Sequence, residues 1–95
     1  MGKAQKLFDQ WADNIPREAR LQDVKTFLNY YFSDMWKQQK SSHIVVRCEA
    51  LKNISDYKPY GEISVPVKGG QKVKGFYIKR LVKAVRDLSE IGGEP

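Results

Sequence analysis

The chain has 95 residues, a formal net charge of +6, 41% apolar residues and 29% charged residues. This length suffices for one hydrophobic core, and the composition is typical of a folded globular protein rather than a disordered one. No apolar run approaches the ~18 residues of a membrane-spanning helix, and the single cysteine, Cys48, has no partner for an internal disulfide. The residues after Met1 do not form a secretory signal, so we expect a cytoplasmic protein. The positive charge favours a polyanionic partner such as nucleic acid.

Two amphipathic helices are predicted in the first third of the chain. Over residues 3–13, apolar side chains recur at three- and four-residue spacings, in a stripe that continues to Ile15. Pro16 ends this helix, because a residue before proline is pushed out of the α region. A second stripe predicts a helix over residues 20–32, closed by a Ser-Asp turn at 33–34.

Three short strands and one long helix are predicted in the rest of the chain. The strands occupy residues 35–39, 43–48 and 62–67. Pro66 indicates a strand terminus or an edge position, because proline cannot donate to the ladder. We expect a loop over residues 50–60 and a turn at Gly69 and Gly70. An amphipathic stripe over residues 75–91 predicts the last helix.

The order of these elements predicts an α+β fold. A small three-stranded antiparallel sheet, with helices packed on one face, would bury the apolar side of each strand. The whole chain, residues 1–95, is expected to form one domain. Helix 3–13 would be an N-terminal extension of it, and residues 92–95 a frayed tail.

Alternation within the second strand assigns its side chains to the two faces of the sheet. Ile44, Val46 and Cys48 would point towards the helices, whereas His43 and Arg47 would lie on the open face. A slip of one residue in register would exchange the two faces. The predicted exposure of the only histidine therefore depends on this register.

The last third of the chain carries an uninterrupted basic segment. Between Glu62 and Asp87 there are seven basic residues and no acidic residue. Basic residues on a helix surface usually form only its solvated face. The absence of acids over this length nevertheless favours contacts with phosphate groups.

Three segments, in the same order along the chain, resemble parts of one known family. The run Lys40-Ser41-Ser42-His43-Ile44-Val45-Val46 is similar to the Gly-Ser-His-His signature of HicA-type toxins, the ribonucleases of bacterial toxin–antitoxin pairs. Residues 63–68 resemble the strand of that family that ends in proline, and residues 72–82 resemble the segment that opens its last helix. The resemblance spans roughly residues 7–88.

This resemblance implies an α-β-β-β-α layout similar to double-stranded-RNA-binding domains, and cleavage of mRNA without a metal or other cofactor. It also implies neutralisation by a separate HicB-like antitoxin. His43 would be the catalytic residue, and RNA contacts are expected from Lys40, Ser42, Arg47, Lys68, Lys72, Lys74, Lys79 and Arg80. The chain departs from the family at Ser41, where glycine is usual, and at Ile44, where a second histidine is often found.

Cleavage of RNA needs little more than proton transfer and charge stabilisation, because the 2′-hydroxyl is a built-in nucleophile. An imidazole suits either proton role near neutral pH. The candidates for stabilising the developing charge are, in order, Arg47, Lys40 and Lys68. With one histidine, the second proton would have to travel through water, a lysine, a tyrosine or a neighbouring chain.

Two other functions remain open from the sequence. The first is an RNA-binding module on the same fold that has no catalytic activity. The second is a protein whose basic surface binds an acidic protein. The sequence contains no metal-ligand cluster, glycine-rich phosphate loop or serine–histidine–acid arrangement, so metal and acyl-transfer chemistry are not expected.

Overall fold

The computed structural model describes residues 2–40 and 42–91. The helices are α1 (Lys3–Asp13), α2 (Leu21–Tyr31) and α3 (Gly75–Glu90). The strands are β1 (Glu18–Arg20), β2 (Trp36–Gln39), β3 (His43–Arg47), β4 (Glu62–Pro66) and β5 (Lys72–Lys74). Two short 3-10 turns, η1 (Glu49–Leu51) and η2 (Ser55–Tyr57), lie between β3 and β4. The predicted frayed tail at residues 92–95 and the departure at Ser41 lie outside the described residues.

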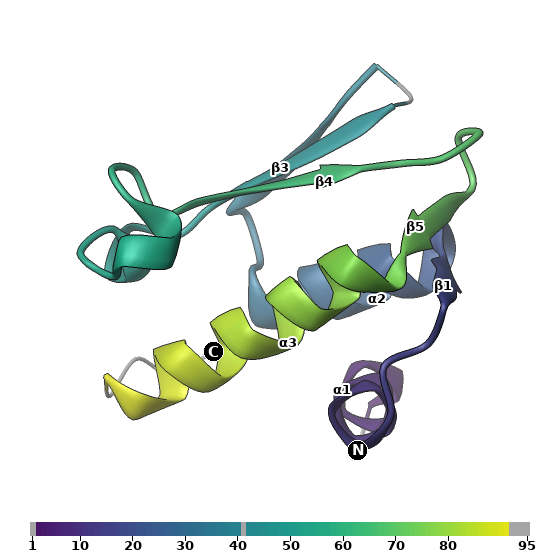
Figure 1. The fold of residues 1–95 in the computed structure, drawn as a ribbon, viewed down its shortest axis with the longest axis horizontal. Helices are drawn as coiled ribbons and strands as arrows, with labels where there is room; N and C mark the ends of the chain where they lie inside the picture. The colour runs from purple at the N-terminus through teal and green to yellow at the C-terminus, as the bar shows by residue number, and fades with distance from the viewer. Residues whose placement is uncertain (1, 41, 92–95) are drawn as a thin grey trace.

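Strands β2, β3 and β4 form an antiparallel sheet with β3 in the centre. The register pairs Ile44 with Val65 and Val46 with Ile63, and all four side chains are fully buried. Figure 1 shows the three helices on one side of this sheet. The predicted α+β class, with a small antiparallel sheet covered by helices on one face, is confirmed.

The opposite face of the sheet is open, as the alternation predicted. Lys37, His43 and Ser64 are exposed on it, and Val45 in its centre is half-buried. Pro66 is the last residue of β4, which is an edge strand. The edge position explains how a proline can end this strand without removing a ladder hydrogen bond.

A second, two-stranded sheet was not predicted from the sequence. Strands β1 and β5 pair antiparallel, with Ala19 opposite Val73. These two side chains are the buried ones of their strands, and the residues on either side of each are charged and at least partly exposed. Three residues with one buried position give no detectable alternation, so the sequence offered no strand signal here.

Helix α1 has the predicted bounds and packs through its apolar stripe on α2. The rings of Trp11 and Phe27 lie 5.3 Å apart between centroids, and both side chains are buried. Ile15 does not continue this stripe, because the helix ends at Asp13 and Ile15 is 37% exposed. None of the helices within residues 2–40 and 42–91 combines the length and the apolar character needed to cross a bilayer.

The loop before β4 is fastened to α3 by Tyr57. The buried phenol donates a hydrogen bond of 2.8 Å to Oδ2 of Asp87. Lys83 Nζ donates to the same oxygen at 2.8 Å and pairs with Asp56 at 2.8 Å. Burial, and next the hydrogen bond to Asp87, raise the pKa of Tyr57 to about 12. Burial alone would raise the pKa of Asp87, but the hydrogen bonds from Lys83 and Tyr57 outweigh it and hold that pKa below its usual value.

We predict that Tyr57→Phe lowers the free energy of unfolding by roughly 1–2 kcal/mol, because a hydrogen bond to a carboxylate is lost. The neutral phenol is the form favoured by folding, so this contribution is present below the ordinary tyrosine pKa of about 10 and disappears as the pH rises towards 12. Urea unfolding measures the stability. Absorbance titration should show an ionisation near pH 12 that Tyr57→Phe removes and Tyr60→Phe retains. A Tyr57→Phe variant that keeps this late ionisation would contradict the assignment.

Candidate nucleic-acid interface

His43 begins β3 on the open face of the sheet, and its side chain is exposed. Its neighbours across the sheet are Gln39 on β2 and Pro66 on β4. The Oγ of Ser42 lies 3.3 Å from Nδ1 of the imidazole. The ring is therefore accessible from solvent, and the adjacent hydroxyl can orient it through the nitrogen that it contacts.

Arg47 shares the open face with His43 but lies at the opposite end of β3. Four residue steps along the strand separate them, which corresponds to about 13 Å. The guanidinium Nε lies 3.4 Å from a carboxylate oxygen of Glu62, and the guanidinium carbon lies 5.6 Å from the ring centroid of Tyr60. The structure therefore does not bring Arg47 beside His43.

Two other expected cations lie at the same end of the sheet as His43. Lys40 is in the turn between β2 and β3 and has a positive φ of 55°. Just after β4, the amide of Val67 donates a hydrogen bond of 2.8 Å to the carbonyl of Ser42. This bond holds the next residue, Lys68, near the start of β3. Lys40, Ser42, His43 and Lys68 are thus brought to one end of the sheet.

The basic segment continues from Lys68 through a glycine turn into β5. Gly69 and Gly70 both have positive φ, at 60° and 73°, a conformation that glycine adopts without steric cost. Lys68 and Lys72 then face each other in an isolated antiparallel bridge. Lys72 and Lys74 are exposed on β5, on either side of the buried Val73. This turn therefore concentrates positive charge at one edge of the molecule.

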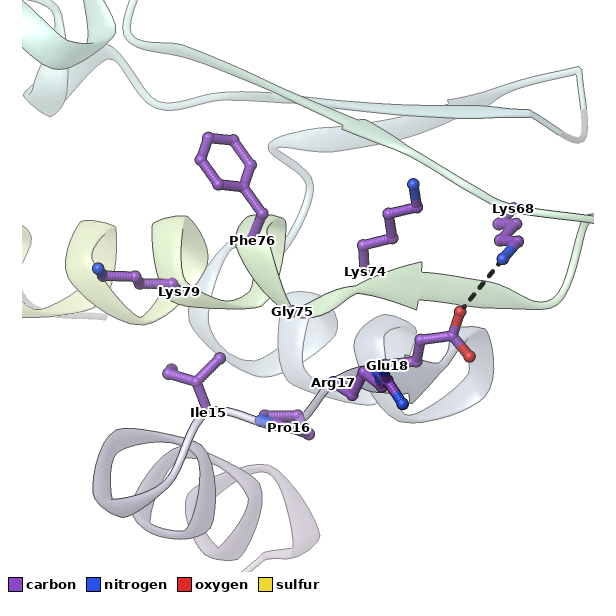
Figure 2. A pocket seen from close by; sticks show the side chains of 9 residues that line it. All are labelled: Ile15, Pro16, Arg17, Glu18, Lys68, Lys74, Gly75, Phe76 and Lys79. Carbon is purple, nitrogen blue, oxygen red and sulfur yellow. Dashed lines mark ion pairs between the residues drawn. The ribbon is translucent and has the colours of Figure 1, made fainter.

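A hollow of about 550 Å³ lies between this edge and the start of α3. We call it the basic hollow (Figure 2); it is lined by Ile15, Pro16, Arg17, Glu18, Lys68, Lys74, Gly75, Phe76 and Lys79. Its only acidic residue, Glu18, lies 3.6 Å from the ammonium of Lys68. Arg17, Lys74 and Lys79 are exposed, and no carboxylate among residues 2–40 and 42–91 pairs with them. The hollow therefore presents three cations that are free to meet an anion.

The backbone contact at Gly75 sets the shape of the basic hollow. The amide of Gly75 donates to the carbonyl of Arg17 at 2.8 Å. A Cβ at this position would collide with the carbonyl oxygen of Pro16. Only glycine lets the segment of residues 15–17 lie so close to the first turn of α3.

Three of the four basic side chains of α3 differ in whether other residues of the chain already bind them. Lys79 is exposed, whereas Arg80 is half-buried and donates at 3.4 Å to the carbonyl oxygen of Asp56. Lys83 is held by Asp56 and Asp87 at 2.8 Å each. Lys79 is thus the most available of the three for an external phosphate.

Of the nine residues that line the basic hollow, sequence reasoning had named only Lys68, Lys74 and Lys79 as site residues. Arg17, Phe76 and Ile15 are among those that it missed. The signal for Phe76 was present, because it precedes the apolar stripe of α3 by two residues and so falls on the other side of the helix. Arg17 could be connected with the basic segment only through the unpredicted pairing of β1 with β5. Within the described residues, no three histidine, cysteine, aspartate or glutamate side chains are grouped so that they could hold a metal ion.

Comparison with known protein families, with characterised proteins and with solved structures found no match to this chain. Its function is therefore argued from the site itself.

We predict that Gly75→Ala lowers the free energy of unfolding by roughly 1–3 kcal/mol, because the backbone must move to make room for the methyl group. Urea unfolding provides the measurement. Gly2→Ala is the matched control, since a Cβ there meets no atom within 4 Å, and it should cost about 1 kcal/mol or less. Equal losses for the two variants would show that the close approach at Gly75 has no special role.

Proposed function

We propose that this chain is a HicA-like ribonuclease that cleaves mRNA in the cytoplasm without a metal, with His43 as its general acid or base. The observation that carries the proposal is the placing of an exposed imidazole at the end of the sheet where the basic segment begins. His43 pairs with Pro66, and Lys68 lies two residues further along the chain. A polyanion held by the basic segment would therefore have a proton-transfer group within reach.

The chemistry asks little of the protein. The 2′-oxygen of the ribose attacks the adjacent phosphorus, and the bond from phosphorus to the 5′-oxygen breaks. The products are a 2′,3′-cyclic phosphate and a free 5′-hydroxyl. His43 removes the proton from the 2′-hydroxyl or delivers one to the leaving 5′-oxygen, a contribution typically worth on the order of 10²–10⁴ in rate.

Charge stabilisation would come from Lys40 and Lys68 rather than from Arg47. The phosphorane carries extra negative charge, and cations near it lower the barrier. Both lysines lie at the His43 end of the sheet, whereas Arg47 lies at the other end. Arg47 is paired with Glu62 and Lys68 with Glu18, so Lys40 is the first candidate. Because the chain has one histidine, the second proton passes through water or a lysine, and modest turnover is expected.

The partner implied by the proposal is a HicB-like antitoxin that covers His43 or the basic surface. A small gene for such a protein beside the gene for this chain would support this pairing. The most direct physical signature would be a complex whose formation depends on salt, because the surface to be covered is basic.

One observation favours a second candidate, an RNA-binding protein on the same fold that does not cut. The guanidinium of Arg47 lies at the far end of β3 and already contacts Glu62 and Tyr60. Among the described residues of the open face, no arginine therefore lies beside the imidazole of His43. The two candidates agree that RNA binds and differ only in whether His43 acts on it.

We predict that purified protein cuts single-stranded RNA in the presence of a metal chelator and that His43→Ala slows the cutting by about 10²-fold or more. Gel analysis of a labelled RNA measures the rate. Asn53→Ala, which alters an exposed neutral side chain in the loop before β4, is the control and should cut at the wild-type rate. Thermal unfolding should show that His43→Ala stays folded.

Three results would contradict this assignment in different ways. RNA that binds to the wild type without being cut would support the second candidate. Equal cutting by wild type and His43→Ala would place the activity elsewhere. The absence of any RNA binding at low salt would favour a partner-binding protein with an acidic target.

We also predict that Lys40→Ala lowers the single-turnover cleavage rate by about tenfold or more, whereas Arg47→Ala changes it by less than about threefold. The physical reason is that Arg47 lies at the opposite end of β3 from His43 and is already paired with Glu62. Lys52→Ala is the control for loss of one positive charge, because Lys52 is paired with Glu49 beyond the far end of β3. A larger loss for Arg47→Ala than for Lys40→Ala would reverse this order.

A further inference from the structure

We propose that the basic hollow binds a single-stranded stretch of RNA, with one unpaired base stacked on the ring of Phe76 and the neighbouring phosphates held by the cations of the hollow. This inference rests on the proposed function, since it assigns part of the same RNA to a surface under the edge of β4. It adds the surface that selects a single strand and a residue that contacts a base.

The charge of the basic hollow selects an anionic occupant. Four of its nine lining residues are cationic and one is acidic, and the acid already lies beside Lys68. Arg17, Lys74 and Lys79 reach it from three different segments: the chain before β1, the end of β5 and the first turns of α3 (Figure 2). Cations that line one hollow from separate elements, with their charged ends spread around it, can contact several phosphates of a strand.

The aromatic residue of the basic hollow is unusually open for a phenylalanine. Phe76 is 65% exposed, and in Figure 2 its ring projects from the first turn of α3. The half-buried Tyr77 ring packs perpendicular to it, with centroids 5.0 Å apart and planes at 89°. One isolated exposed phenylalanine would need no explanation. Here, however, the ring packs against Tyr77 and lines the same hollow as four cationic side chains.

Phe76 also lines a second hollow, of about 400 Å³, on the same helix. Its other lining residues are Asp56, Tyr57, Arg80 and Lys83, and Asp56 already pairs with Lys83. The three- and four-residue spacings of Phe76, Lys79, Arg80 and Lys83 put them on one face of α3. A strand that crosses this face would place a base at the ring and a phosphate at Lys79, which is exposed and has no carboxylate partner among the described residues.

This combination of a stacking ring with nearby cations is how proteins hold single-stranded nucleic acid. A base offers its face to an aromatic ring only when it is not already stacked in a duplex. Stacking on an aromatic side chain is worth about 1–3 kcal/mol per base and tolerates any sequence. An acidic protein would satisfy the cations, but it would use the exposed face of Phe76 only if it also placed an apolar side chain there.

The decisive experiment separates the base from the phosphate. Fluorescence anisotropy at low salt would measure binding of a labelled 2′-O-methyl RNA of about ten nucleotides, which lacks the nucleophile for cleavage. The second probe is the same strand with abasic positions, which keeps the phosphates but lacks bases that could stack. The third is the duplex of the base-bearing strand, which has phosphates and bases but hides the faces of the bases within the stack. An acidic peptide of equal charge is the fourth probe.

We expect Phe76→Ala to weaken binding of the base-bearing single strand by roughly 5- to 100-fold, and Phe76→Trp to restore it. The abasic strand and the duplex should bind Phe76→Ala and wild type alike. Lys79→Ala should weaken the base-bearing and abasic strands by the same factor, because it removes a phosphate contact. The matched control is Tyr30→Ala, which removes a 55% exposed aromatic ring from α2 and should leave all affinities unchanged.

The outcomes that overturn the inference are distinct from those that overturn the proposed function. If the wild type binds single strands and Phe76→Ala binds them equally well, the stacking role is wrong while RNA binding stands. If the duplex binds as tightly as the single strand, the strandedness is wrong. If the acidic peptide competes with equal affinity and the same dependence on Phe76, the hollow is a protein-binding site. If no nucleic acid binds the wild type, both proposals fail.

Discussion

The close contact between the chain before β1 and the first turn of α3 is the constraint on which the basic hollow depends. It joins segments almost sixty residues apart through one hydrogen bond, from the amide of Gly75 to the carbonyl of Arg17. Because Gly75 has no side chain, the two backbones can meet where a Cβ would collide. The contact continues the pairing of β1 with β5, and it carries Arg17 to the side of Lys74 and Phe76. Without it, the cations of the basic hollow would belong to separate surfaces.

The main sheet and the helices could be predicted from the sequence because their apolar periodicity is strong. Alternation in β3 assigned the buried face to Ile44 and Val46 and the open face to His43, and the structure agrees. The β1–β5 pair could not be found in this way. Each strand has three residues and one buried side chain, so its existence depends on contacts between distant segments rather than on local pattern. The missed pair is also the reason why the basic hollow was missed.

The distribution of charge shows a second limit of sequence reasoning. The segment between Glu62 and Asp87 is free of acids along the chain but not in space. Glu18, from β1, approaches Lys68, and Asp56, from the preceding loop, approaches Lys83. A run of cations therefore overstates the charge that is available to a ligand. The structure divides the run into engaged side chains and free ones, and two of the free ones, Lys74 and Lys79, lie around the start of α3.

The separation of His43 from Phe76 has a consequence for how a nuclease of this design would work. His43 lies on the open face of the sheet, whereas Phe76 projects from the first turn of α3 (Figure 2), which packs with the other helices on the opposite side of the sheet (Figure 1). Binding energy gained at Phe76 is remote from the reacting phosphate, and such energy raises the rate of the chemical step only when it positions the ribose at the imidazole. If it merely anchors the strand, it lowers KM and leaves kcat unchanged. For a nuclease with one histidine and weak charge stabilisation, the larger gain in rate would come from holding the ribose and phosphate in the correct geometry at the imidazole.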